Sequence, residues 1–275
     1  MPTGAADKLY DRVNHLFAET LKGGNDSARP WKAVHTLRTM GSRLVFEKAL
    51  AWCSSPAPRK RMRAVAVLSQ LRTPLKSGPS LGFRSEPVFR DESFAIIAEM
   101  LEHEQDVCAL QSQIFAFGHL DNLAAAPLIK RFVDHPNEDI RYALAFSLGS
   151  LHEHPDAIAP LTKLADDSDK DVRNWAIFAL GVIGDADSEE LRQLFLAHLD
   201  DKFLDARIEA ACALGKRRDA RLAAPLIRMF QKDRALNGLI EAAKDLLEID
   251  EKLPDWFENE YIAALKDRFP SETAS

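Results

Sequence analysis

The sequence has few cysteines, and they are far apart. Cys53, Cys108 and Cys212 are the three cysteines among 275 residues, and each lies within an apolar helical pattern. An odd, scattered set indicates neither a disulfide framework nor a cysteine-ligated metal site. We therefore expect these side chains to pack in the core or to line a groove as small apolar groups.

Long apolar segments are missing as well. No apolar run approaches the roughly 18 residues that a membrane-spanning helix needs. The first seven residues also lack the apolar core of a signal peptide. The sequence thus predicts a cytoplasmic protein without a membrane partner.

Catalytic signatures are absent too. The sequence contains no Gly-rich phosphate loop and no nucleophile elbow. His152 and His154 are two residues apart, whereas two ligands on one helical face need a spacing of four. We expect no prosthetic group, no metal and no enzymatic activity.

Charge is unevenly distributed along the chain. Residues 1–90 contain 16 Lys and Arg against 6 Asp and Glu, whereas residues 91–275 contain 20 against 36. An asymmetry of this size indicates a charged partner or head-to-tail association of the chain with itself. It does not distinguish nucleic acid from an acidic protein.

What the sequence does have is an internal repeat. A run that begins Asp-x-Arg and ends Leu-Gly occurs three times, with its arginines 32 and then 34 residues apart. A second phrase, Ala-Pro-Leu, recurs at positions 126, 159 and 224. A period of about 30 to 45 residues is typical of a stacked solenoid. Each repeat should hold two helices, the second opened by Asp and closed by Gly; the runs are Asp139–Gly149, Asp171–Gly181 and Asp205–Gly215.

Small and apolar residues recur in these second helices at offsets of 0, 4, 7 and 8, which form one helical stripe. A single helix pair cannot bury such a stripe, so several pairs must stack. The stripes are Ile140, Leu144, Ser147, Leu148; Val172, Ala176, Ala179, Leu180; and Ala206, Ala210, Ala213, Leu214.

The same reading predicts about seven helix pairs and a final amphipathic helix. Residues 1–72 form degenerate, basic repeats; 73–90 form an insertion, with three Pro, two Gly and three Ser between 73 and 87; 91–250 form regular repeats; and 251–275 form a C-terminal cap. The 73–87 loop is either a variable insertion or a partner-contacting loop.

The repeat resembles the HEAT repeat, especially the short HEAT-like repeats of phycobilin lyases, and a group of uncharacterised bacterial HEAT-repeat proteins. The run Asp171–Gly181 (DVRNWAIFALG) carries this resemblance, which covers 91–250 well and 28–72 loosely. It implies an all-α, right-handed α-α superhelix, a HEAT-like solenoid, extending as one domain over residues 1–275.

In HEAT-type solenoids the second helices line a concave, partner-binding face. By that resemblance we expect a non-catalytic protein-binding scaffold, an adaptor, or an inhibitor of the immunity-protein type. A Trp at a non-core position of a groove is typical of an interaction hot spot, although Trp175 could instead pack locally between helices. The expected contact residues are Tyr142, Arg173, Asn174, Trp175, Arg207 and Glu209.

Acidic residues stand seven positions before each repeat arginine. They are Asp134, Asp166 and Asp200, and we interpret these Asp–Arg sets as a ladder that connects one repeat to the next.

A basic cluster lies at the start of an earlier helix, where the helix dipole disfavours cations. Its residues, Arg59, Lys60, Arg61 and Arg63, are a candidate anion-binding site or a solvated face. This leaves open a nucleic-acid binder, or a HEAT-like DNA glycosylase with Asp171 near Trp175. The acidic residues around Asp171 would repel phosphates. Chromophore handling of the phycobilin-lyase kind is a further alternative, based on the repeat resemblance.

Overall fold

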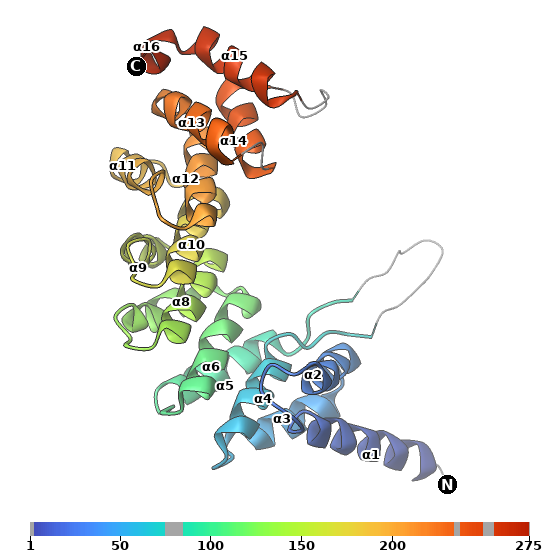
Figure 1. Ribbon diagram of the computed structural model, residues 1–275. Coiled ribbons are helices and arrows are strands. Elements are labelled where there is room, and N and C mark those ends of the chain that lie inside the picture. Colours follow the sequence, from blue (N-terminus) through green and yellow to red (C-terminus); the bar gives the residue numbers. More distant parts are fainter. Residues whose placement is uncertain (1–2, 75–84, 234–236, 250–255, 275) are drawn as a thin grey trace. The chain divides into compact units, whose positions relative to one another are not determined.

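Helices account for all the regular structure in the computed structural model, which describes residues 3–74, 85–233, 237–249 and 256–274. Within these ranges the sole β-type pairing is an isolated antiparallel bridge between Arg72 and Pro87. The chain divides into two compact units, residues 1–129 and 130–275. Figure 1 shows helix pairs throughout both units, which confirms the all-α prediction.

The first unit contains three complete helix pairs and the start of a fourth. Helices α2, α4 and α6 pack in sequence as the second helices of their pairs, and α1, α3 and α5 as the first. The elements are α1 (Thr3–Glu19), α2 (Ala28–Met40), α3 (Arg43–Cys53), α4 (Pro58–Leu68), α5 (Arg90–Leu101), α6 (Val107–Leu120), η1 (Leu123–Ala125) and α7 (Ala126–Ile129).

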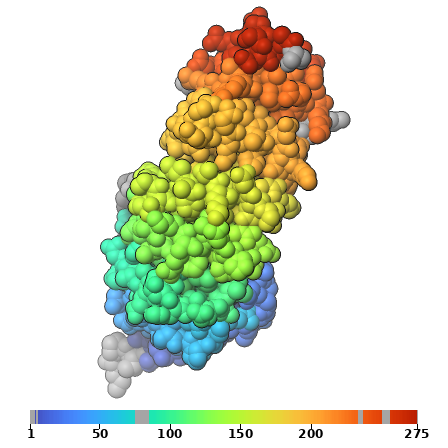
Figure 2. Space-filling model, turned by 90° about the vertical axis from the view of Figure 1, so that its left-hand side faces the viewer, coloured from blue at the N-terminus to red at the C-terminus, as the bar shows by residue number. Residues whose placement is uncertain are grey.

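The described part of the second unit contains further helix pairs, followed by α15, a helix that packs on α13 and α14. Helices α8, α10, α12 and α14 pack on one another in order, and α15 covers α13 and α14. Figure 2 shows these pairs as successive bands of colour. The elements are η2 (Lys130–Phe132), α8 (Glu138–Ser150), α9 (Pro155–Leu164), α10 (Lys170–Phe178), η3 (Ala179–Ile183), α11 (Glu189–His198), α12 (Leu204–Lys216), η4 (Ala220–Leu222), α13 (Ala223–Asp233), α14 (Asn237–Leu247), α15 (Glu258–Arg268) and α16 (Pro270–Thr273).

The predicted insertion begins and ends as two paired arms. The Thr73 amide donates to the Glu86 carbonyl at 2.8 Å, and the Val88 amide donates to the Leu71 carbonyl at 2.9 Å. Residues 75–84 of the predicted 73–87 loop lie outside the described residues, as do residues 251–255 of the predicted C-terminal cap and the preceding residue 250.

The predicted apolar stripe is buried in the core of the second unit. All twelve of its side chains are buried, from Ile140 to Leu214, and none is more than 3% exposed. Asp139, Asp171 and Asp205 lie in the first turns of their helices, while Asn137 and Asp169 supply the N-cap hydrogen bonds of α8 and α10. The periodic pattern therefore identified the packed face correctly.

The expectation that Gly closes each second helix is wrong. Gly149 and Gly215 lie inside α8 and α12, and Gly181 lies inside η3, a π-helical turn that prolongs α10. A Cβ atom on Gly181 would be 2.3 Å from the Ala213 Cβ, and one on Gly215 would be 2.6 Å from the Ala242 carbonyl oxygen. These glycines are needed because neighbouring second helices approach each other closely at those points.

A methyl group at Gly215 should therefore destabilise the second unit. We expect Gly215→Ala to lower the free energy of unfolding by about 1–3 kcal/mol, because the clash is with backbone that cannot rotate away. Urea denaturation measures the change. Gly24→Ala is the control, since a Cβ there meets no atom within 4 Å, and a comparable loss in that variant would contradict the close-packing explanation.

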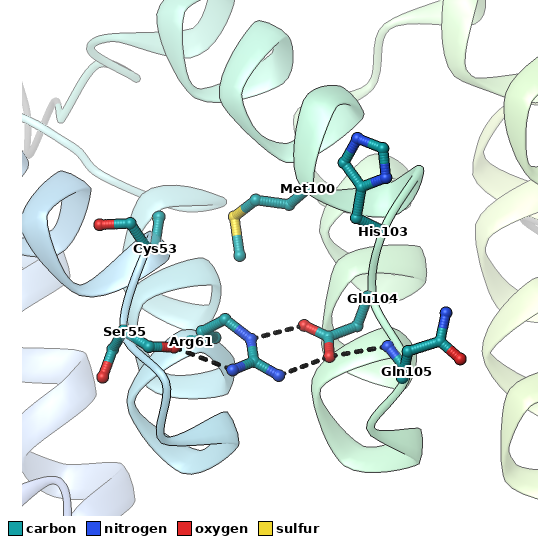
Figure 3. Close-up of a pocket in the computed structure, with 8 residues that line it drawn as sticks. Cys53, Ser55, Arg61, Met100, His103, Glu104 and Gln105 are labelled. Carbon is teal, nitrogen blue, oxygen red and sulfur yellow. Dashed lines mark hydrogen bonds and ion pairs between the residues drawn. The ribbon is translucent and has the colours of Figure 1, made fainter.

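Arginines near the starts of the second helices connect successive repeats. The Arg61 guanidinium donates to both carboxylate oxygens of Glu104, at 2.8 and 2.6 Å (Figure 3). Arg141 does the same to Asp167, at 2.6 and 2.9 Å, and Arg173 to Asp201, at 2.9 Å for both bonds. Each acid also accepts a backbone N–H two residues further on. We call this series the arginine ladder.

The remaining guanidinium nitrogen connects each arginine to its own repeat. In these three arginines, and also in Arg207, Nη1 donates to the carbonyl oxygen six residues earlier, at 2.8–2.9 Å; the acceptors are the carbonyls of Ser55, His135, Asp167 and Asp201. One planar guanidinium thus joins a loop of its own helix pair to a loop of the next helix pair. Arg can make both contacts because its donors are fixed in one plane, whereas the Lys ammonium is a point charge.

The ladder was predicted, but with the wrong acids. Arg141 and Arg173 pair with Asp167 and Asp201, which lie in the following repeat and one residue after the expected Asp166 and Asp200. Asp134 instead pairs with Lys163 at 2.5 Å, and Asp166 lies 3.3 Å from His198. The reason is that each arginine reaches forward to an acid 26 or 28 residues later in the chain, which an acid seven residues before the arginine does not indicate.

Removing one ladder charge should cost stability in a pH-dependent way. The hydrogen bonds from Arg173 lower the pKa of Asp201 to about 2. An unfolded Asp titrates near 3.9, so this stabilisation is complete above about pH 5 and disappears as the pH falls toward 2. We expect Asp201→Asn to destabilise by about 2–4 kcal/mol at neutral pH, and by much less at about pH 3.

Chemical denaturation at several pH values tests this expectation. The matched control is Asp200→Asn, which removes an exposed carboxylate one residue away. Equal losses in the two variants, or a loss for Asp201→Asn that does not depend on pH, would contradict the assignment.

Candidate functional site

Four of the six predicted contact residues lie on one face of the stacked second helices. Tyr142 on α8, Asn174 and Trp175 on α10, and Glu209 on α12 stand five or six residues after their N-caps, and all four are half-buried. We call the surface that they form with their neighbours the second-helix face. Its residues are Tyr142, Phe146, Asn174, Trp175, Phe178, Ile208, Glu209 and Cys212, all half-buried.

An aromatic cluster occupies the part of this face formed by α8 and α10. The Trp175 ring lies 6.0 Å from Tyr142, 5.3 Å from Phe146 and 5.6 Å from Phe178, measured between ring centroids. Interplanar angles of 70–88° make all three contacts edge-to-face, the arrangement favoured by the ring quadrupoles. Trp175 therefore packs between two helices and still reaches the surface.

Two members of this cluster were missed in the sequence. Phe146 lies four residues after Tyr142, and Phe178 lies three residues after Trp175. Those spacings place side chains one turn apart on the same helical face. Extending each candidate by one turn would have found both.

Glu209 stands on α12 at the position that Trp175 has on α10. Among the described residues it has no hydrogen-bond or ion-pair partner. Burial and, to a smaller extent, the nearby charge of Asp205 raise the pKa of Glu209 to about 7. It is thus a carboxyl group that titrates near neutral pH at the edge of the aromatic cluster.

Negative charge continues from α12 onto α14. Burial, assisted by Glu209, Asp245 and Glu241, raises the pKa of the Cys212 thiol to about 12, and the thiol lies 3.2 Å from the Gly238 carbonyl oxygen. A neutral thiol is a poor nucleophile. The second-helix face therefore changes from aromatic on α8 and α10 to acidic on α12 and α14.

The predicted contact residues Arg173 and Arg207 have structural partners instead. Arg173 belongs to the arginine ladder, and Arg207 donates to the Asp201 carbonyl oxygen at 2.9 Å. Their contact with a partner stays a prediction.

A family model of HEAT repeats matches residues 95–181 and 125–202. Residues 95–202 therefore contain HEAT repeats. The matched segments include α8 and α10, so the aromatic cluster lies within them.

Similar proteins share the fold over nearly the whole chain. Protein YibA of Escherichia coli strain K12 is 25% identical over 94% of this chain and 93% of its own length. The X-ray structure of YibA superposes with a TM-score of 0.69 at 23% identity and covers 98% of both chains. A crystal structure of an engineered protein superposes with a TM-score of 0.52 at 17% identity, over 93% of this chain and 71% of that one. The predicted α-α superhelix is therefore confirmed as the fold, and the name YibA states no activity.

A phycobilin-lyase structure is among the neighbours at lower similarity. The complex of CpcE and CpcF of phycocyanin lyase from Nostoc sp. PCC7120 has a TM-score of 0.48 at 15% identity, over 94% of both chains. Similarity at this level carries no functional argument.

The basic cluster of the first unit does not form one exposed surface. Arg63 is 0% exposed, donates to the carbonyls of Thr20 and Asn25 at 3.0 and 2.9 Å, and lies 4.9 Å from the Trp31 ring. Burial lowers the pKa of Arg63. The sequence could not show this, because the acceptors are turn carbonyls about 40 residues away from the helix that holds the arginine.

The other three cations of the cluster also have partners within the chain. Arg61 belongs to the arginine ladder, Arg59 donates to the Gly23 carbonyl, and Lys60 lies 5.5 Å from the Trp52 ring. Anion binding by the cluster stays a prediction, but the observed contacts hold α4 against the α1–α2 turn.

A cleft of about 350 Å³ adjoins the first contact of the ladder (Figure 3). Its lining includes Cys53, Arg61, Met100, His103 and Glu104. Burial raises the pKa of the Cys53 thiol to about 12, and the Glu104 carboxylate is held by Arg61. The cleft thus offers neither a thiolate nor a free carboxylate.

In the described part of the chain, no group of three or more His, Cys, Asp or Glu side chains is placed to hold a metal ion. No helix there has the length and apolar character needed to cross a bilayer.

The raised pKa of Glu209 predicts a stability effect of known sign. An unfolded Glu titrates near 4.3, whereas folded Glu209 titrates at about 7. The folded state therefore binds the proton more tightly, and stability falls as the pH rises from about 4 to about 7. We expect Glu209→Gln to raise the melting temperature at about pH 8 and to leave it nearly unchanged at about pH 4.

Thermal unfolding of the two proteins across this pH range tests the assignment. Asp205→Asn should give a smaller gain of the same sign, because Asp205 is the lesser cause of the shift. A Glu209→Gln variant that is no more stable than the wild type at pH 8 would contradict the raised pKa.

Proposed function

We propose that this chain is a non-catalytic scaffold, adaptor or inhibitor, located in the cytoplasm, that holds another protein on its second-helix face. The aromatic cluster around Trp175 carries the proposal. A large ring that is packed on three sides and still reaches the surface is a rigid anchor, and binding to it costs little side-chain entropy. The HEAT-repeat fold supports a binding role.

The chemistry of the face favours binding over catalysis. The potential nucleophile beside the Glu209 carboxyl group is the Cys212 thiol, whose pKa of about 12 keeps it neutral. Acid–base and nucleophilic catalysis both need paired groups within hydrogen-bond reach. The surface is better suited to apolar contact and charge recognition.

Nucleic acid is the less favoured partner. Affinity for nucleic acid comes mainly from cations that contact phosphates. The cations of the basic cluster are bonded within the chain, and the acidic groups on α12 and α14 would repel a phosphate backbone near Trp175. The same repulsion opposes a glycosylase that uses Asp171.

Loss of the Trp175 ring should weaken partner binding strongly. We expect Trp175→Ala to weaken the complex by about 30-fold or more, the effect of removing a hot-spot residue. Affinity capture followed by titration of the recovered partner measures the loss. The control is Trp31→Ala, which removes a 41% exposed Trp from α2 in the other unit.

A second measurement covers the possibility that Trp175→Ala disturbs folding. Replacing Trp31, Trp52 and Trp256 by Phe leaves Trp175 as the single tryptophan, whose fluorescence should change when the partner binds. A partner that binds all the variants equally well and leaves this fluorescence unchanged would place the binding site elsewhere.

A further inference from the structure

We propose that Glu209 receives a Lys or Arg side chain of the bound protein, while a neighbouring apolar side chain of the same segment packs on Trp175. The partner is then a cationic, amphipathic segment of another protein. This inference rests on the proposed function and adds the chemistry of the partner.

The positions of the two residues define the spacing that such a segment needs. Trp175 and Glu209 both lie six residues after their N-caps, on helices that pack against each other. Packed helices have axes about 8–10 Å apart. That distance corresponds to about three residues of an extended chain, or about six to seven residues of a helix.

The charged groups near Glu209 are acidic, so they favour the binding of a cation. Asp205 lies one turn earlier on α12 and acts directly on Glu209. On α14, Glu241 and Asp245 act on the adjacent Cys212. Residues 174–183 of α10 and η3 contain no charged side chain. The surroundings of Glu209 are thus acidic on two helices and apolar on the third.

Cations near this region are engaged with other groups. Lys244 on α14 lies 3.5 Å from Glu241, Lys216 at the end of α12 lies 2.7 Å from Asp185, and Arg207 donates to the Asp201 carbonyl oxygen. A half-buried carboxylate beside an aromatic cluster, with negative neighbours, complements a positive side chain from outside. A carboxylate or phosphate ligand would meet repulsion instead.

Such a contact makes binding dependent on pH. A cation favours the charged form of Glu209, so affinity should rise with pH through the pKa of about 7. The ionised fraction increases about tenfold between pH 6 and pH 8, and the affinity should increase by a similar factor.

The experiment begins with a random peptide library displayed on phage and selected on the folded chain at about pH 8. We expect enriched peptides to carry Lys or Arg at one of the two spacings from an aromatic or branched apolar residue. Enrichment of peptides without a cation would overturn the inference.

A selected peptide without histidine is then titrated by calorimetry at pH 6 and pH 8. We expect the wild type to bind about tenfold more tightly at pH 8. Glu209→Gln should bind at least about tenfold more weakly than wild type at pH 8 and show no pH dependence. Glu241→Gln is the control and should retain the pH dependence.

The variants separate failure of this inference from failure of the proposed function. If Trp175→Ala loses the peptide while Glu209→Gln binds as the wild type does, the second-helix face is the binding site and the cation contact is wrong. If neither variant changes the affinity, both proposals fail. If sedimentation shows that the chain self-associates and that Glu209→Gln dissociates it, the occupant is a second copy, which overturns the choice of partner.

Discussion

The forked ion pair between an arginine of one repeat and an acid of the next determines how the second helices stack. Its two N–H···O bonds are parallel and charge-assisted, so they define an orientation as well as an attraction. Since the third nitrogen donates to a carbonyl of the same repeat, each guanidinium connects two loops rigidly. The buried stripe supplies most of the stabilisation, but a stripe of Ala and Leu alone would tolerate sliding. The arginine ladder sets the register within each unit.

That register explains the composition of the second-helix face. The arginines four residues after each N-cap form the ladder. The residues one and two positions later take no part in it. Their identities differ between repeats, as Ala143, Trp175 and Glu209 show. Ala143 is buried, while the other two reach the surface. A regular scaffold thus carries an irregular surface, and the proposed partner chemistry follows from that irregular part.

The same logic separates the two groups of charged residues. Ladder acids such as Asp201 are held ionised by arginine, which lowers their pKa. Glu209 receives no cation from within the described chain, so burial raises its pKa instead. The pKa of Asp201 is lowered and that of Glu209 is raised because the first carboxylate has a paired cation and the second has none. The group without a pair is the one available to a partner.

The sequence by itself determined the helix pairs, the buried stripe, the existence of a ladder and half of the residues of the second-helix face, because these follow from periodicity within about one repeat. Only the tertiary structure decided what the recurring glycines do, which acid each arginine holds, that Arg63 is buried and that Glu209 titrates near neutral pH. Each of these depends on atoms brought close by stacking: the Ala213 methyl group beside Gly181, the loop of the next pair, the α1–α2 turn and the packing around α12. A local sequence pattern predicts which face of a helix is buried, but it does not predict which atoms of other repeats pack against that face.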